Sequence, residues 1–311
     1  MRVTKFVFTV CVILLLALFA NGMYVLSKPG GGGRIPAPVP ISDYKGQITI
    51  EPEFRHLESS TNEENPLNLL VLGLDRDGTR CDVIMLFNFE PGLSKLNLLS
   101  IARDTRVRES GRYGKINALY SKGGEKLVAE EVTEITGLPV HYYLTMDFKG
   151  FRKIVDTLGG VQFYVPFRMN YEDPTQDLYI HLRKGMQLLD GKKAEQLVRY
   201  RKGNFKGQGY TEGDIGRIKM QQDFLKALIK QKMSLRYISR VDDIYGILRK
   251  YVKTNITLTD ITQHLGSIRE IKADEIKTYT IPGESRMIGD SWYFIYDRDE
   301  IYTIINDNFY K

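Results

Sequence analysis

Three short stretches of this sequence contain acids and arginines that could bind a ligand or take part in catalysis. In the first, LVLGLDRDGTRCDVIMLF, Asp75, Arg80 and Asp82 stand in a charged gap between two apolar runs. Two carboxylates at a strand end can share Mg²⁺, which usually takes one or two carboxylates and leaves its other positions to water and phosphate oxygens. A solvated hairpin with ordinary Asp-Gly turn chemistry is the alternative explanation of the same residues.

The second stretch, SIARDTRV, places Arg103 and Asp104 directly after a predicted strand. The ends of strands are where α/β proteins collect ligand-binding groups. The alternative is a surface ion pair, which contributes little to stability.

The third stretch, LVRYRKGNFKGQGYTEGDIGRIKMQQ, begins with two arginines, Arg199 and Arg201. We interpret their surroundings as a short strand, in which residues two apart point to the same face. A glycine-rich loop follows them. A mobile loop beside a solvated basic helix is the alternative.

The same stretch ends in a predicted helix that Asp214 precedes. Arg217 and Gln221 are four residues apart on this helix and therefore share a face. The first turn of a helix also exposes backbone N–H groups and the positive end of the helix dipole. Together the three stretches supply acids, arginines and a helix N-terminus.

Arginine forks bind phosphate oxygens in pairs. Carboxylates fit among such arginines when a metal ion neutralises them and the ligand carries its own negative charge, so the sequence predicts a pyrophosphate site with Mg²⁺, or alternatively Mn²⁺. The glycines match no nucleotide-binding pattern, and no zinc-protease or serine-hydrolase motif is present. The net charge of +6 includes no block of five or six Lys/Arg, so nucleic acid is not an expected partner.

The elements that position these residues follow from apolar periodicity. Strands alternate with helices along the chain, and this order predicts one α/β domain with a largely covered central sheet. Strands are expected at 69–72, 83–89, 96–101, 141–146, 161–167, 198–201 and 278–281, and helices at 125–136, 148–158, 192–197, 215–231, 239–252 and 298–308.

Residues 6–26 contain no charge and, as a helix rising about 1.5 Å per residue, are long enough to cross a bilayer. We predict a retained transmembrane anchor; a cleaved signal peptide is the alternative, although its apolar region would normally be only about 7–15 residues long. The short N-terminal tail favours an N-in, C-out orientation in the cell membrane. The expected organisation is a cytoplasmic tail (1–5), an anchor (6–26), a Gly/Pro-rich stalk and weakly patterned linker (27–66) and an extracytoplasmic domain (67–311).

Six motifs occur in the order and spacing of the LytR-CpsA-Psr family, which this chain resembles over residues 67–232. They are LVLGLDRDGTRCDVIML, LLSIARDTRV, GKINALY, MDFKGFRKIVDTLGGVQFYVP, KGMQLLDGKKAEQLVRYRK and GDIGRIKMQQDFLKALI. The resemblance implies a three-layer α/β fold with a central mixed sheet flanked by helices. It also implies an enzyme that transfers a glycopolymer from a polyprenyl-pyrophosphate carrier to a peptidoglycan hydroxyl, without a nucleotide.

The resemblance also implies roles for individual residues. Asp75 and Asp82 match the Mg²⁺-associated acids, and Asp75 is the first candidate for the catalytic base, with Asp104 the second. The expected pyrophosphate ligands are Arg80, Arg103, Arg199, Arg201, Arg217 and Gln221, with Asp214 in support. Cys81, Val83, Ala102 and Met220 depart from the usual family residues. The alternatives to transfer are hydrolysis of the polyprenyl pyrophosphate and a non-enzymatic role as a membrane-bound sensor or transcriptional attenuator.

Overall fold

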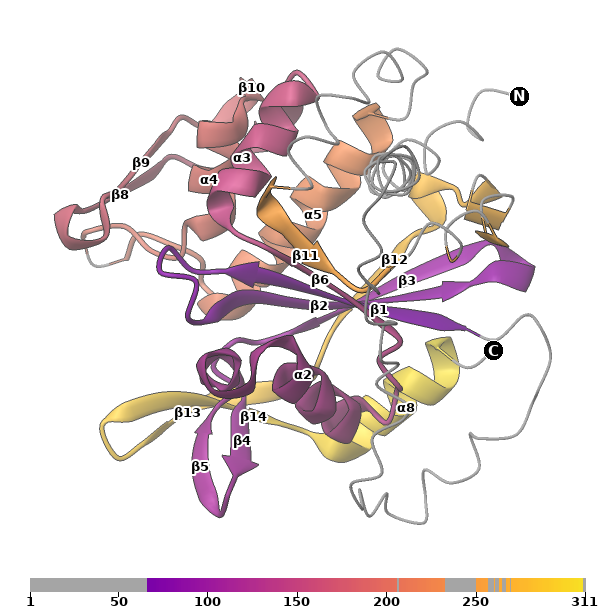
Figure 1. Cartoon of the computed structure of the whole chain (residues 1–311). Helices are drawn as coiled ribbons and strands as arrows, with labels where there is room; N and C mark the ends of the chain where they lie inside the picture. The colour runs from indigo at the N-terminus through magenta and orange to yellow at the C-terminus, as the bar shows by residue number, and fades with distance from the viewer. Residues whose placement is uncertain are drawn as a thin grey trace, which may run out of the picture. The chain divides into compact units, whose positions relative to one another are not determined.

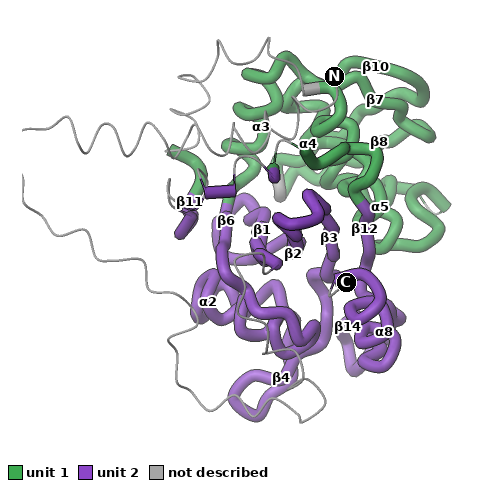
Figure 2. Tube along the Cα trace, turned by 90° about the vertical axis from the view of Figure 1, so that its right-hand side faces the viewer, with its two compact units in different colours: residues 1–21, 146–252, 268–276 green, residues 22–145, 253–267, 277–311 purple. Residues whose placement is uncertain are grey.

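The computed structural model describes residues 66–205, 207–232, 250–256, 260, 263–264, 267–268 and 270–309. These residues fall into two compact units, which Figure 2 colours separately. Unit 1 takes its described residues from 146–252 and 268–276, and unit 2 takes its own from 66–145, 253–267 and 277–309.

Unit 2 is built on a six-stranded mixed sheet with the strand order β11-β6-β1-β2-β3-β12 (Figure 1). Strands β1, β2 and β3 are antiparallel neighbours, and β12 adds a parallel edge to β3. Two strands of the sheet cross the boundary between the units by one residue: the last residue of β6 and the first residue of β11 are counted in unit 1. The strands are β1 (Leu67–Leu74), β2 (Cys81–Glu90), β3 (Lys95–Ile101), β6 (Tyr142–Met146), β11 (Val252–Thr254) and β12 (Lys277–Thr280).

Three asparagines fix the register of the central strands. Asn68, Asn88 and Asn97 occupy matching positions on β1, β2 and β3 and are almost fully buried. Asn88 Nδ2 donates to Asn68 Oδ1 at 2.9 Å, and Asn97 Nδ2 donates to Asn88 Oδ1 at 3.4 Å. Because a slip by one residue would leave these buried amides without partners, the ladder opposes any other pairing.

Two helices cover one face of this sheet: α2 (Ile116–Thr136) and α8 (Arg298–Asn308) (Figure 1). Their apolar stripes bury Val128 and Val132 from α2 and Ile301 and Ile305 from α8. The unit also carries two small hairpins, which are β4 (Arg106–Glu109) with β5 (Arg112–Lys115), and β13 (Gly283–Ile288) with β14 (Ser291–Tyr296). Short 3₁₀ turns occur at Pro91–Leu93 and, in unit 1, at Pro174–Gln176 and Ala273–Glu275.

Unit 1 surrounds its own apolar core, in which Tyr200 and Phe224 are among the largest fully buried side chains. Asp147 begins the first helix, because its side chain accepts a 2.7 Å hydrogen bond from Gly150 N. Strand β7 pairs with β10 and β8 pairs with β9. The elements are α3 (Phe148–Thr157), β7 (Val161–Val165), β8 (Met169–Asp173), β9 (Leu178–Leu182), β10 (Gly185–Leu189), α4 (Gly191–Arg199) and α5 (Asp214–Lys232).

The predicted α/β class, with a central mixed sheet and flanking helices, is confirmed. The predicted strand over 198–201 is wrong: Val198 and Arg199 belong to the last turn of α4, and Tyr200 is its C-cap. These residues are helical because Ala194, Leu197 and Val198 form one apolar face of α4, and this face is buried in the core of unit 1.

Two predictions fall wholly or mostly outside the described residues. They are the N-terminal segments, namely the anchor (6–26) and the stalk and linker (27–66, of which only Pro66 is described), and most of the helix over 239–252, whose last residue belongs to β11. Within the described part of the chain, no helix combines the length and the apolar character needed to cross a membrane.

Candidate functional site

Asp75 closes the loop between β1 and β2. Its Oδ1 accepts hydrogen bonds from the backbone N–H groups of Thr79 at 2.9 Å and Arg80 at 3.1 Å, and its own N–H donates to Arg80 O at 2.9 Å. Among the residues that the structure describes, its Oδ2 receives only a long contact of 3.5 Å from Thr79 Oγ1. The Asp75 carboxylate therefore shapes the loop with one oxygen and keeps the other accessible.

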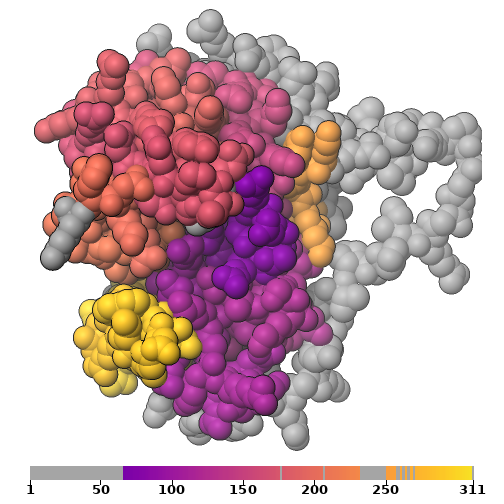
Figure 3. Space-filling model, turned by 90° about the vertical axis from the view of Figure 1, so that its left-hand side faces the viewer, coloured from indigo at the N-terminus to yellow at the C-terminus, as the bar shows by residue number. Residues whose placement is uncertain are grey.

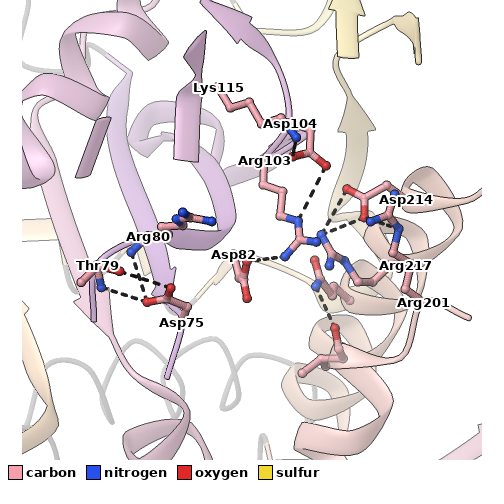
Figure 4. A network of polar contacts seen from close by, with 12 residues as sticks. Asp75, Thr79, Arg80, Asp82, Arg103, Asp104, Lys115, Arg201, Asp214 and Arg217 are labelled. Atoms are coloured by element: carbon pink, nitrogen blue, oxygen red, sulfur yellow. Dashed lines mark hydrogen bonds and ion pairs between the residues drawn. The ribbon is translucent and has the colours of Figure 1, made fainter. Parts of the chain in front are cut away.

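Asp82 and Arg103 form an ion pair that joins the start of β2 to the end of β3 (Figure 4). Each side chain keeps 22% of its exposure, so the pair is partly withdrawn from water but still reachable. The pair arises because β2 and β3 are antiparallel neighbours, so that the beginning of one strand meets the end of the other. The structure thus brings the first and second predicted stretches together within unit 2.

Cys81, which departs from the family pattern, lies under this loop and is fully buried. Burial raises the pKa of its thiol, and the Asp82 and Asp75 carboxylates raise that pKa further. The thiol is therefore held in its neutral form at the foot of the Asp75–Asp82 loop.

The Asp104 carboxylate lies beside two cationic side chains. Lys115 Nζ lies 2.9 Å from Asp104 Oδ1, and Arg103 Nε lies 4.0 Å from Asp104 Oδ2. Sequence reasoning missed Lys115, although the lysine stands in the GKINALY motif just before α2. Its partner Asp104 is 18% exposed, which leaves the carboxylate open to a substrate proton.

The second cluster belongs to unit 1 and is centred on Asp214, the first residue of α5. Asp214 Oδ1 lies 2.9 Å from Arg217 Nη2 and 3.6 Å from Arg201 Nε. Arg217 is almost buried, whereas Arg201 keeps 42% of its side-chain exposure. Arg217 is therefore largely withdrawn from water, whereas Arg201 is open to a ligand; Figure 4 draws both arginines beside Asp214.

Gln221 holds helices α4 and α5 together. Its Nε2 donates a 2.9 Å hydrogen bond to Val198 O, one of the carbonyls left unpaired at the end of α4. Tyr210 packs over Gly216 near the start of α5, and burial raises the pKa of its hydroxyl while the Arg217 cation lowers it.

We expected Arg199 and Arg201 to point to the same face of a strand. This expectation is wrong, because Arg199 is the last residue of helix α4. Arg199 Nη1 binds Glu195 Oε1 at 2.8 Å, one helical turn back, and its guanidinium lies 4.9 Å from the centre of the Phe148 ring. Glu195 also binds Arg152 at 2.6 Å. Arg199 and Arg201 therefore contact different acids.

No group of three or more His, Cys, Asp or Glu among the described residues could enclose a metal ion. Mg²⁺ does not require such a group, since one or two carboxylates and phosphate oxygens suffice. Asp75 Oδ2 and the second oxygen of Asp82 have no short contact with the described residues. The donor chemistry of these two acids is the kind that Mg²⁺ takes in proteins.

Comparison with known proteins places these residues in a family. The family model for LytR_cpsA_psr matches residues 42–309. The polyisoprenyl-teichoic acid–peptidoglycan teichoic acid transferase TagV of Bacillus subtilis (strain 168) is 30% identical over 244 residues, which are 75% of this chain and 61% of TagV. The transferase TagU of the same organism is 28% identical over 81% of this chain and 80% of TagU.

The crystal structure of B. subtilis TagV matches with a TM-score of 0.65 and 28% identity, covering 80% of this chain and 98% of the crystallised one. The agreement thus extends from the motifs to the arrangement of the elements. The chain belongs to the LytR-CpsA-Psr family.

Proposed function

We propose that this protein is a phosphotransferase that moves a glycopolymer from a polyprenyl-pyrophosphate carrier to a hydroxyl of peptidoglycan. The support comes from family membership and from the names of TagV and TagU, which describe transfer of teichoic acid from a polyisoprenyl carrier to peptidoglycan. The observation that carries the proposal is the partly exposed Asp82–Arg103 pair, which offers a cation and a carboxylate to one phosphorylated ligand.

The reaction is a displacement at phosphorus. The oxygen of the acceptor hydroxyl attacks the phosphorus nearest the glycopolymer, and the bond from that phosphorus to the bridging oxygen breaks. Polyprenyl phosphate leaves with the bridging oxygen, and a phosphodiester joins glycopolymer to peptidoglycan. Arginine side chains stabilise the negative charge that develops on the phosphate oxygens. Arg103, paired with Asp82, is placed for this role in unit 2, and the family resemblance implies the same role for Arg80, Arg201 and Arg217. In unit 1, Gln221 holds α4 to α5 and Asp214 orients Arg201 and Arg217.

A carboxylate must accept the proton of the attacking hydroxyl. Asp75 and Asp104 are the two candidates, and their surroundings favour Asp104. The Asp75 carboxylate is bound to two backbone N–H groups of its own loop, whereas among the described residues the partners of the Asp104 carboxylate are side chains, which a substrate can displace.

Asp75 and Asp82 would hold Mg²⁺ or Mn²⁺, which supplies positive charge to the pyrophosphate when bound. Asp82 already faces a cation in Arg103, so a single carboxylate here can serve the metal and the arginine with different oxygens.

The direct test supplies purified full-length protein in detergent with a radiolabelled polyprenyl-pyrophosphate-linked glycan and isolated peptidoglycan. We expect label to become attached to peptidoglycan and free polyprenyl phosphate to appear in equal amount. Addition of EDTA should stop the transfer, and Mg²⁺ or Mn²⁺ in excess should restore it.

Two results would contradict the proposal. Release of polyprenyl phosphate at the same rate with and without peptidoglycan, with glycan left in solution, would identify a hydrolase that uses water as the acceptor. Binding of the lipid without any bond cleavage would favour the sensor role.

A further inference from the structure

A row of cations and aromatic rings covers one side of the β4–β5 hairpin. Arg106 pairs with Lys115 across the two strands, and Arg108 pairs with Tyr113. Residues opposite each other and two apart share a face, so all four side chains lie on the same side of the hairpin. Tyr293 of β14 adjoins them, and we call these five residues the arginine–tyrosine face.

The hairpin β13–β14 attaches to this region of unit 2. Thr105 and Phe294 form a parallel bridge, and Phe294 N donates a 2.9 Å hydrogen bond to Asp104 O. Figure 3 shows β13–β14, in yellow, projecting at the surface of the molecule. This contact brings Tyr293 beside residues that lie almost 190 positions earlier in the sequence.

Arg106 is stacked on the ring of Tyr113, and the ring of Tyr293 lies farther from it. Its guanidinium carbon lies 3.6 Å from the centre of the Tyr113 ring and 6.0 Å from that of Tyr293. Stacking fixes the guanidinium plane and leaves the N–H groups within that plane. The Nε atom of Arg106 is buried without a hydrogen-bond partner among the described residues. The stack therefore holds the Arg106 guanidinium in place, while its Nε–H group still lacks an acceptor among the described residues.

The face carries positive charge that the described residues do not neutralise. Lys115 is paired with Asp104, but neither Arg106 nor Arg108 forms an ion pair with a described carboxylate. Like charges gathered on one face of a hairpin reduce its stability. An anionic ligand would remove this cost, and the exposed ring of Tyr113, at 56%, offers the ligand a flat apolar surface.

We propose that the arginine–tyrosine face binds the acceptor, a peptidoglycan glycan strand. Sugar rings present C–H groups that stack on the electron-rich faces of aromatic rings, and the carboxylates of the stem peptides fit the forks of Arg106 and Arg108. The inference rests on the proposed transfer to peptidoglycan and names the surface that delivers the acceptor.

The contact between this face and Asp104 indicates that the face binds the acceptor and not the glycopolymer donor. Lys115 belongs to the face and binds Asp104, and its ammonium lies 5.6 Å from the centre of the Tyr293 ring. A strand lying on the face therefore runs toward the carboxylate that we propose accepts the proton of the attacking hydroxyl. The acceptor hydroxyl has to reach that carboxylate, whereas the distal part of the donor polymer does not.

The test measures sedimentation of full-length protein with peptidoglycan sacculi stripped of teichoic acid. We expect Tyr113→Ala and Arg108→Gln each to weaken binding about tenfold, the effect of losing one stacking or ionic contact. In transfer assays the same variants should raise KM for peptidoglycan and leave KM for the lipid donor unchanged. Amidation of the sacculus carboxylates should weaken wild-type binding and abolish the difference between wild type and Arg108→Gln.

Tyr164→Ala is the matched control, because Tyr164 is 51% exposed but belongs to β7 of unit 1. Unchanged sedimentation of Tyr113→Ala, or absence of wild-type binding, would overturn the inference. So would selective loss of binding to the soluble donor glycan or to vesicles of phosphatidylglycerol and phosphatidylcholine. Sacculus binding that depends on Tyr113 in a protein that transfers nothing would instead contradict the proposed function and leave the inference standing.

Discussion

At the scale of residues, the partner of each charged side chain decides what the side chain can do. Asp75 and Asp104 have the same chemistry, yet Asp75 is bound by backbone groups and Asp104 by the side chain of Lys115. Backbone partners fix a carboxylate as part of a loop, whereas side-chain partners can exchange with a substrate. The sequence identifies both acids, but only these contacts separate their roles.

Replacement of Arg103 by alanine tests the role of the arginine in the Asp82 pair. We expect kcat for transfer to fall about 10²- to 10³-fold, because one preorganised donor to the transition-state charge is lost. The measurement is initial-rate kinetics with lipid-linked donor and peptidoglycan.

Arg183→Ala, an exposed arginine of unit 1, is the control for loss of one positive charge. Arg103→Lys should recover only part of the rate, since lysine keeps the charge but cannot offer a planar fork. Wild-type turnover by Arg103→Ala would remove Arg103 from the mechanism.

At the scale of elements, apolar periodicity predicts most of what forms. The final helix occupies Arg298–Asn308 as expected, and the three central strands extend the predicted ranges by one or two residues at their ends, except that β3 ends at Ile101 as predicted. The failure over 198–201 has a local cause: a run of four residues fits a strand as well as a helix end, and burial of the α4 face decides between them. The hairpins β4–β5, β8–β9 and β13–β14 were not predicted, because each of their strands has only four to six residues.

Helix α2 contains an acid whose proton is linked to folding. Burial, aided by Glu134 and Glu109, raises the pKa of Glu131 from 4.5 to about 7. The folded state therefore binds this proton more tightly than the unfolded state, so its contribution to stability is complete below pH 4.5 and is lost as the pH rises through about 7.

We expect Glu131→Gln to stabilise the protein at pH 8 by about 1 kcal/mol, a value reduced for the partial exposure of the side chain, and to have little effect at pH 4.5. Urea unfolding followed by circular dichroism at the two pH values measures this difference. Glu130→Gln, at the preceding position of α2, is the control. An equal effect of Glu131→Gln at both pH values would exclude the linkage.

At the scale of the whole molecule, the apolar segment 6–26 predicts where the protein works. We propose a single-pass protein of the cell membrane with its N-terminus inside and its catalytic part outside, which would give that part access to peptidoglycan. The support is the uncharged length of the segment, which matches the thickness of the hydrocarbon core.

Fractionation tests this topology. Full-length protein should sediment with membranes, a variant without residues 1–40 should remain in the supernatant, and protease added outside intact protoplasts should digest residues 67–311. Protection of these residues until the protoplasts are lysed would reverse the predicted orientation.

The sequence by itself determined the α/β class, the family and the list of acids and arginines, because these depend on local periodicity and on motifs a few residues long. The tertiary structure decided which of these residues meet. The register of β2 against β3 pairs Asp82 with Arg103, and the docking of β14 beside Thr105 creates the arginine–tyrosine face. Contacts between segments so far apart in the chain depend on how strands pair and apolar faces pack, and no local pattern records them.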